Sequence, residues 1–137
     1  MVEFRTVEEA LHVLGEASID ARTRDAAYQF LQHMDPHSEI AELVEALRSE
    51  HFKVRWAAAK RLSEMGRPAL RGILNVLVDP QKVGDQQLRD GIYHVLHNNR
   101  DPYVREVTSH LLQDLHGSAA DLRTMQEASH LLREMAD

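Results

Sequence analysis

The sequence predicts an all-helical fold of about eight helices arranged in four antiparallel pairs. Three observations lead to this fold class. Apolar residues recur at helical spacing along nearly the whole chain, prolines and glycines fall between most of these segments, and no segment alternates like a strand. The connections are mostly a few residues long, which makes consecutive helices antiparallel neighbours. A length of 137 residues fits a single domain, 1–137.

Start and stop signals divide the chain into these helices. Side chains that accept hydrogen bonds from free backbone N–H groups favour helix starts, proline is tolerated in the first turn, and glycine favours helix ends. The predicted caps are Thr6, Asp35, Asp101 and Ser118, and the predicted stops are Gly66 and Gly117. The predicted helices are 6–17, 20–34, 36–49, 52–65, 67–78, 85–98, 102–116 and 118–135.

An internal repeat is visible in four of these segments. Each copy carries an arginine at its second position and a leucine at its ninth, and the copies begin at Thr23, Val54, Leu88 and Val104. In three of the four copies an aspartate stands three residues before the start, which gives the signature D-x-x-[VLT]-R. We expect the aspartate to cap the helix, and the arginine to reach that carboxylate or one in a neighbouring repeat.

The segment VRWAAAKRLSEMG at 54–66, followed by RPALRGILNVL, resembles the HEAT repeat, and especially the short bacterial HEAT-like repeats shared with phycobilisome lyases. The resemblance covers about 20–116 and implies an armadillo-like solenoid, a right-handed α-α superhelix. Its repeats would be 6–34, 36–65, 67–98 and 102–135. Two features depart from the pattern: His51 replaces the aspartate, and the interval from Arg89 to Arg105 is about half the earlier ones. We expect 102–116 to serve as the first helix of the last pair, with 118–135 as its partner.

The resemblance also implies a binding surface, because the second helices of HEAT-like solenoids line the concave side. The aligned positions outside the core are Asp25, Gln29, Trp56, Lys60, Glu64, Asp90, His94 and His97. Trp56 is the only tryptophan and occupies a slot that holds aspartate in two other copies. It is either an exposed anchor for a partner or a ring packed over the alanines of 52–65 or the flank of 20–34.

No catalytic, metal or cofactor site is predicted. Asp90, His94 and His97 share one helical face and could hold a transition metal, but nine histidines make such pairings common, so a solvated polar face is favoured. Phosphate-binding loops, nucleophile motifs and H-E-x-x-H are absent from the sequence. The His-Glu dipeptides on which HEAT-like iron hydroxylases rely are absent too.

The charge balance disfavours nucleic acid as a partner. Acidic residues number 22 against 16 basic ones, a formal net charge of −6. One basic region could form a local patch, although dispersal around helices and pairing with neighbours such as Glu50 and Glu64 is favoured. Its members are Arg48, Lys53, Arg55, Lys60, Arg61, Arg67 and Arg71. The loop 79–84 is longer than the other connections and is either a functional loop or a neutral insertion.

These observations favour a protein-protein interaction scaffold or adaptor that binds an unidentified protein as a monomer or weak dimer. The alternatives are a subunit of a bilin lyase-type enzyme and a nucleic-acid-binding HEAT-like protein. No apolar run is long enough to span a bilayer and no targeting segment is recognisable, so we expect a cytoplasmic protein without membrane partners.

Overall fold

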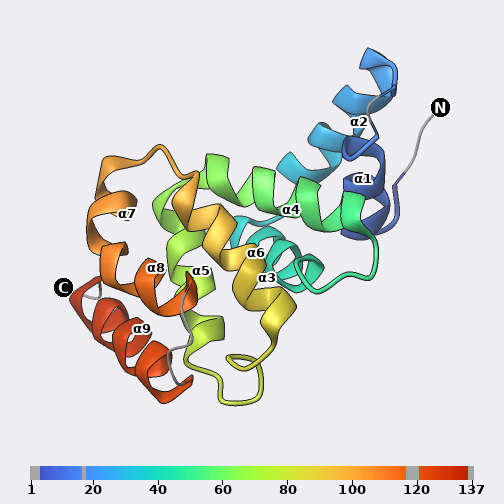
Figure 1. Cartoon of the computed structure of the whole chain (residues 1–137). Helices are drawn as coiled ribbons and strands as arrows, with labels where there is room; N and C mark the ends of the chain where they lie inside the picture. Colours follow the sequence, from blue (N-terminus) through green and yellow to red (C-terminus); the bar gives the residue numbers. More distant parts are fainter. Residues whose placement is uncertain (1–3, 17, 117–120, 136–137) are drawn as a thin grey trace.

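The computed structural model describes residues 4–16, 18–116 and 121–135, and over these ranges every regular element is a helix. The all-α prediction is therefore confirmed. The helices are α1 (Val7–Leu14), α2 (Ala21–Gln32), α3 (Pro36–Ala46), α4 (Phe52–Met65), α5 (Arg67–Leu77), α6 (Gln86–His97), α7 (Pro102–Val107), α8 (Ser109–His116) and α9 (Asp121–Met135) (Figure 1).

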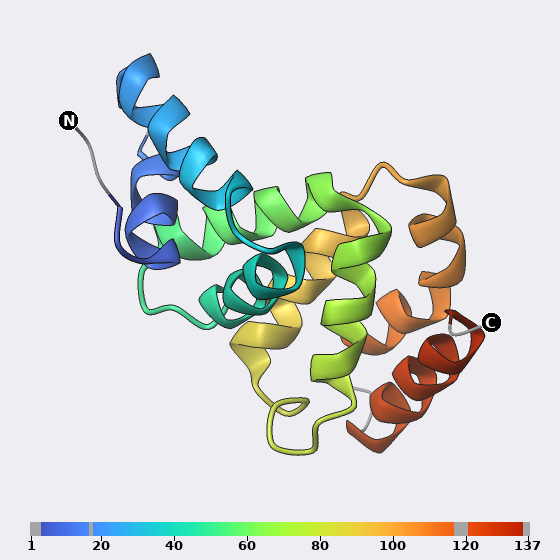
Figure 2. The same cartoon turned by 180° about the vertical axis from the view of Figure 1, so that it is seen from behind.

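The helices pack in two rows. One row contains α1, α3, α5 and α9, and the other contains α4, α6 and α8. Helix α4 also packs against α1, α3 and α5, and therefore joins the two rows. Helix α2 packs against α1 and projects away from the other helices, as both views show (Figures 1 and 2).

The core between the rows is built from leucine, isoleucine and valine. The fully buried large side chains are Leu11, Leu31, Leu43, Leu47, Leu62, Leu70, Ile73, Leu74, Leu77, Leu88, Ile92 and Leu96. One ion pair is buried beside them, where Arg61 of α4 donates to both carboxylate oxygens of Glu39 of α3, at 2.7 and 3.4 Å. This pairing satisfies a carboxylate whose side chain is only 4% exposed.

Three predicted caps are confirmed. Oγ1 of Thr6 accepts the N–H of Glu9 at 3.1 Å, and the carboxylates of Asp35 and Asp101 accept backbone N–H groups in the same way. The signature aspartates Asp20 and Asp85 cap α2 and α6. The other predicted cap and the second glycine stop, Ser118 and Gly117, lie outside the described residues.

Gly66 ends α4, as predicted, and stands immediately before α5. Its φ of 69° and ψ of −136° lie in a region that residues with a Cβ rarely adopt.

Gly15 ends α1 for a different reason. A Cβ at this position would lie 2.6 Å from the carbonyl oxygen of Lys53 in α4, so the missing side chain allows the two helices to approach closely. The first predicted helix, 6–17, is correspondingly too long.

The prediction of one helix over 102–116 is wrong, because α7 and α8 meet at an angle around Thr108 (Figure 1). Thr108 is fully buried, and its hydroxyl donates to the carbonyl of Val104 at 2.6 Å. Such a bond from threonine to the preceding turn competes with the backbone ladder and bends helices. Helix α7 packs against α5 and α6, whereas α8 packs against α6 and α9.

The side chains of the signature arginines do not bond the carboxylates of the aspartates in their own copies. Arg89 is buried and donates to the carbonyls of Val83 at 3.1 Å and Asp114 at 3.2 Å. Its guanidinium also lies 3.6 Å from the carboxylate of Asp121 at the start of α9. Of the two alternatives expected for the arginine, Arg89 thus contacts a carboxylate outside its own copy, that of Asp121, and not that of Asp85.

Arg55 uses the same local geometry as Arg89. It donates to the carbonyl of Ser49 at 2.7 Å, and both arginines thus bond a carbonyl six residues earlier, in the loop that precedes their helix. Arg24 and Arg105, the other two signature arginines, are exposed, and neither side chain makes a hydrogen bond or ion pair to the residues that the structure describes. The arginine consequently fixes the preceding loop in two copies of the repeat.

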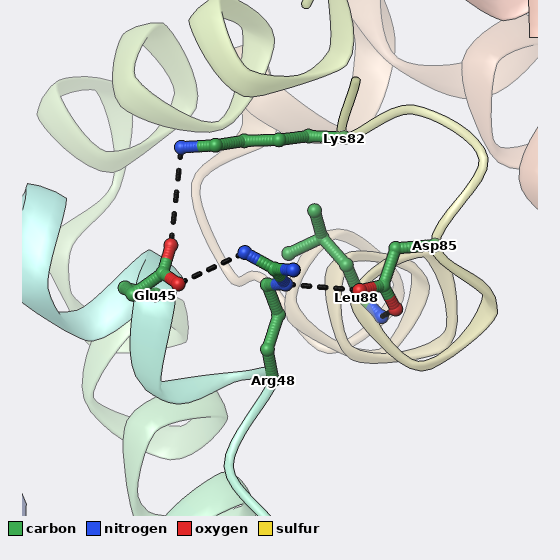
Figure 3. A network of polar contacts seen from close by, with 5 residues as sticks. All are labelled: Glu45, Arg48, Lys82, Asp85 and Leu88. Atoms are coloured by element: carbon green, nitrogen blue, oxygen red, sulfur yellow. Dashed lines mark hydrogen bonds and ion pairs between the residues drawn. The ribbon is translucent and has the colours of Figure 1, made fainter. Parts of the chain in front are cut away.

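An ion-pair network joins the end of α3 to the loop 79–84 and to the start of α6 (Figure 3). Arg48 lies between Glu45 and Asp85 with 2.9 Å to each carboxylate, and Lys82 reaches Glu45 at 3.8 Å. The backbone N–H of Leu88 and then the guanidinium of Arg48 hold the pKa of Asp85 below its usual value. The carboxylates of Asp85 and Glu45 in turn raise the pKa of Arg48.

The loop 79–84 is itself folded onto the core. Val83 is 1% exposed, its carbonyl accepts the Arg89 bond, and Asp79 accepts the N–H of Gln81 at 2.9 Å. Because Lys82 also takes part in the network, the loop braces α3 against α6.

Candidate functional site

A groove of about 1260 Å³ runs between α4 and α6, the neighbouring helices drawn in green and yellow-orange in Figure 1. Its polar and aromatic lining residues come from three segments. They are Phe52, Arg55, Trp56, Lys60, Ser63 and Glu64 of α4, Gln87, Asp90 and His94 of α6, and Asn98, Asn99, Arg100 and Asp101 of the connection to α7. The groove therefore depends on the packing of two second helices of the predicted repeats.

Two aromatic side chains project from the α4 side of this groove. Trp56 is 48% exposed and Phe52 is 69% exposed, and the two are one helical turn apart on the same face of α4. Trp56 is therefore exposed, as its slot in the repeat predicts, and is not a largely buried ring. Exposed aromatic rings beside a concave surface are typical of sites where a partner protein is held.

Phe52 was missed by the sequence reasoning. It precedes the aligned repeat segment, so no comparison between copies drew attention to it. The signal that could have found it is its spacing from Trp56. Four residues on a helix place two side chains on one face, and the exposed tryptophan slot implies that Phe52 is exposed too.

Cations lie against both rings. The guanidinium carbon of Arg55 is 5.8 Å from the centre of the Phe52 ring, and the ammonium of Lys60 is 5.3 Å from the centre of the Trp56 ring. Arg100 adds a third cation to the lining. None of the three pairs with a carboxylate within 4–16, 18–116 and 121–135.

The carboxylates of the groove are Glu64, Asp90 and Asp101. Asp90 accepts a hydrogen bond from the side-chain amide of Gln86 at 2.9 Å. Asp101 is occupied at the start of α7, where it accepts the N–H of Tyr103 at 2.9 Å. Two of the three negative groups therefore already have hydrogen-bond donors from the protein itself.

Five of the eight predicted binding residues line this groove, namely Trp56, Lys60, Glu64, Asp90 and His94. The other three lie outside its lining. Asp25 and Gln29 are exposed on α2, which packs against α1 at a distance from α6. His97 is also exposed, and its ring stacks on the ring of Tyr93 with centres 5.4 Å apart.

Asp90, His94 and His97 do not form a ligand set. Asp90 is bonded to Gln86, and His97 stacks on Tyr93. Across the described part of the chain, no group of three or more histidine, aspartate or glutamate side chains is placed to hold a metal ion.

The basic residues between Arg48 and Arg71 are dispersed, as predicted, although their partners are not Glu50 or Glu64. Arg48 pairs with Glu45 and Asp85, and Arg61 pairs with Glu39. Three other basic residues of this region also have separate contacts: Lys53 pairs with Glu16 at 2.7 Å, Arg67 lies over the Tyr103 ring at 3.8 Å, and Arg71 bonds the carbonyl of Met135 at 3.5 Å. The hydrogen bond and charge of Lys53 lower the pKa of Glu16.

A second cavity of about 520 Å³ is strongly acidic by comparison. Its charged lining residues are Glu8, Glu42, Glu45, Glu50, Asp85 and a single arginine, Arg48. Arg48 is held in the network of Figure 3, so it is already engaged by two of these carboxylates. The groove between α4 and α6 and this second cavity thus differ in charge.

Comparison of the chain with models of protein families, with curated proteins and with solved structures gave no match. Among the described helices, none combines the length and apolar character needed to cross a membrane.

Proposed function

We propose that this chain is a protein-binding adaptor built as a HEAT-like right-handed α-α superhelix, and that it holds a segment of a partner protein in the groove between α4 and α6. The observation that carries the proposal is the pair of exposed rings, Phe52 and Trp56, on the side of that groove. Covering such rings removes apolar surface from water, which favours binding by about 25 cal/mol for each Å² that is buried. Tryptophan is also among the residues that most often dominate binding energy at interfaces.

The dimensions of the groove favour a polypeptide segment over a small ligand. A volume of about 1260 Å³ exceeds the range of about 300–1,000 Å³ typical of small-molecule pockets. The lining mixes two aromatic rings with amide, hydroxyl and charged groups that could bond a peptide backbone, such as Ser63, Gln87 and Asn98. This combination suits an extended chain with one or two apolar side chains.

The packing of helices within pairs supports the first two of the proposed repeats 6–34, 36–65, 67–98 and 102–135, and the last in part, but not the third, because α5 and α6 are not a closely packed pair. Helix α1 packs against α2, α3 against α4, and α8 against α9. Helices α1, α3 and α5 are neighbours in one row, and α4 and α6 are neighbours in the other, as expected for stacked repeats. The last pair departs from the prediction, because α8 packs beside α6 in the row of second helices and α9 packs beside α5 in the row of first helices. The groove then lies between the second helices of the second and third repeats.

No observation favours the bilin lyase or nucleic-acid alternatives. A nucleic-acid site would need a concentrated basic groove around Lys60 and Arg61. Arg61 is instead bonded to Glu39 of α3, and three carboxylates line the groove beside Lys60.

The test is a selection from a displayed library of random short peptides on the full chain. Selected peptides are then assayed against Trp56→Ala and Phe52→Ala, with Leu122→Ala as the matched control. Leu122 is 64% exposed on α9, away from the groove, so its removal deletes a comparable apolar side chain elsewhere. Binding is expected to fall at least about ten-fold with Trp56→Ala and to stay unchanged with the control. An empty selection, or peptides that are indifferent to both aromatic substitutions, would overturn the proposal.

A further inference from the structure

We infer that the segment held in the groove between α4 and α6 is acidic and carries an apolar side chain beside its carboxylates. The inference rests on the proposed function and adds the chemistry of the partner. It follows from the charges of the groove, from how far each is already satisfied, and from the position of the cations relative to the rings.

The groove is the less acidic of the two concave surfaces. Its lining holds the cations Arg55, Lys60 and Arg100 against three carboxylates, in a chain whose formal net charge is −6. The second cavity holds five carboxylates against Arg48. An acidic partner would therefore meet less repulsion, and more positive charge without a carboxylate partner, in the groove than in the second cavity.

The cations of the groove have no carboxylate partner in the described part of the chain, whereas two of its three carboxylates have a hydrogen-bond donor. Asp101 accepts a backbone N–H at the start of α7, where the helix terminus also carries partial positive charge, and Asp90 accepts from Gln86. Lys60 and Arg100, by contrast, have no carboxylate partner in the described ranges. Lys60 and Arg100 are therefore charged groups of the groove that could pair with carboxylates of a ligand.

The position of Lys60 beside Trp56 brings the binding sites for the ligand's carboxylate and for its apolar side chain next to each other. Its ammonium lies 5.3 Å from the centre of the Trp56 ring, a cation–π contact that at an exposed site is worth about 0.5–1 kcal/mol. A ligand carboxylate would draw the ammonium toward itself and leave the ring face open to a neighbouring apolar side chain. Phe52, one turn away, would extend that apolar surface along the segment.

A single-stranded nucleic acid also combines negative charge with flat rings, and it is the competing occupant. It would bring one phosphate per nucleotide into a groove that also holds Glu64 and Asp90. A peptide can instead place its carboxylates only opposite Lys60 and Arg100. The mixture of charges in the lining therefore favours a peptide.

The experiment uses the library selection described above and reads the composition of the peptides whose binding depends on Trp56. Acidic residues next to an apolar residue are expected to be enriched. Synthetic peptides are then made in matched sets: acidic with one phenylalanine, basic with one phenylalanine, and acidic with serine in its place. A single-stranded thymidine oligonucleotide is the fourth probe. Only the first set is expected to bind, and its affinity should fall as salt is added.

Charge reversal supplies the second readout. Lys60→Glu combined with Arg100→Glu should weaken the acidic peptides about ten-fold and strengthen the basic set, since each exposed pair contributes modestly and repulsion replaces it. The control is Arg22→Glu combined with Arg133→Glu, which changes the net charge equally at exposed positions outside the groove. The control should change affinity less than two-fold, which is about 0.4 kcal/mol.

The outcomes separate failure of the proposed function from failure of this inference alone. If no selected peptide depends on Trp56, the proposed function fails and this inference fails with it. If Trp56-dependent peptides are neutral or basic, or respond equally to both charge reversals, only the inference is overturned. Tight, salt-sensitive binding of the oligonucleotide with none of the peptides would assign the groove to nucleic acid and refute both.

Discussion

Replacing the signature arginine with methionine should destabilise the chain by an amount that depends on the copy of the repeat. Arg89 makes two charge-assisted hydrogen bonds, to Val83 and Asp114, while 5% exposed. Bonds that involve a charged group contribute about 1.5–3 kcal/mol each, and their loss leaves buried carbonyls unsatisfied. The contact with Asp121 adds little because that carboxylate is 57% exposed. Arg89→Met should therefore cost about 3–5 kcal/mol, partly offset by burial of the methionine stem.

The same substitution in two other copies of the repeat gives losses of stability with which that at Arg89 can be compared. Arg55 is half-buried and bonds one carbonyl, that of Ser49, so Arg55→Met should cost about 1–2 kcal/mol. Arg24 is exposed and its side chain makes no hydrogen bond or ion pair in the described part of the chain, so Arg24→Met should lie within about 0.5 kcal/mol of the unmodified protein.

The assay is urea unfolding at neutral pH, followed by far-ultraviolet circular dichroism and analysed by linear extrapolation. A domain of this size is typically stable by about 5–15 kcal/mol, so even Arg89→Met should leave a measurable transition. The expected order of destabilisation is Arg89, then Arg55, then Arg24. Equal losses at all three positions, or a large loss at Arg24, would refute the role assigned to the arginine in fixing the preceding loop.

Three further substitutions test other parts of the fold. Asp85→Asn should cost about 0.5–1 kcal/mol at neutral pH by removing the charge that pairs with Arg48. Because the folded pKa of Asp85 is lowered, this contribution is present above about pH 4 and is lost as the pH falls through the folded value, so urea midpoints of variant and unmodified protein should converge in acid. Gly15→Ala should cost about 1–3 kcal/mol in thermal unfolding, since its methyl group meets the Lys53 backbone, and an unchanged melting temperature would contradict that contact. Thr108→Val keeps the side-chain shape and should cost about 1 kcal/mol in urea unfolding, and no loss would mean that the hydroxyl does not stabilise the bend.

The helices and their starts could be predicted because they depend on local chemistry. The caps at Thr6, Asp35 and Asp101 each require only a short polar side chain before a helical segment. The stop at Gly66 requires only a residue without a Cβ. The break at Thr108 could not be predicted in the same way, because apolar spacing continues through it and the bend depends on how a buried hydroxyl and two neighbouring helices are placed.

The groove was predicted in part. The repeat alignment identified Trp56, Lys60 and His94, since equivalent positions of stacked helices tend to share a surface. It also included Asp25 of α2, which the structure places away from the groove, because an alignment gives the face of a helix and not the packing of that helix in the fold. Phe52 lay outside the aligned segment and emerged only from its exposed fraction.

The most direct test of the central claim, that the groove between α4 and α6 holds a partner segment, uses Trp56 as a reporter. It is the only tryptophan in the chain and is 48% exposed, so acrylamide should quench its fluorescence efficiently in the free protein. Saturation with a selected acidic peptide should shift the emission to shorter wavelength and protect Trp56 from acrylamide, with the same midpoint as binding measured by calorimetry. If calorimetry shows saturable binding while the emission and quenching of Trp56 stay unchanged, the partner binds elsewhere and the assignment of the groove is wrong.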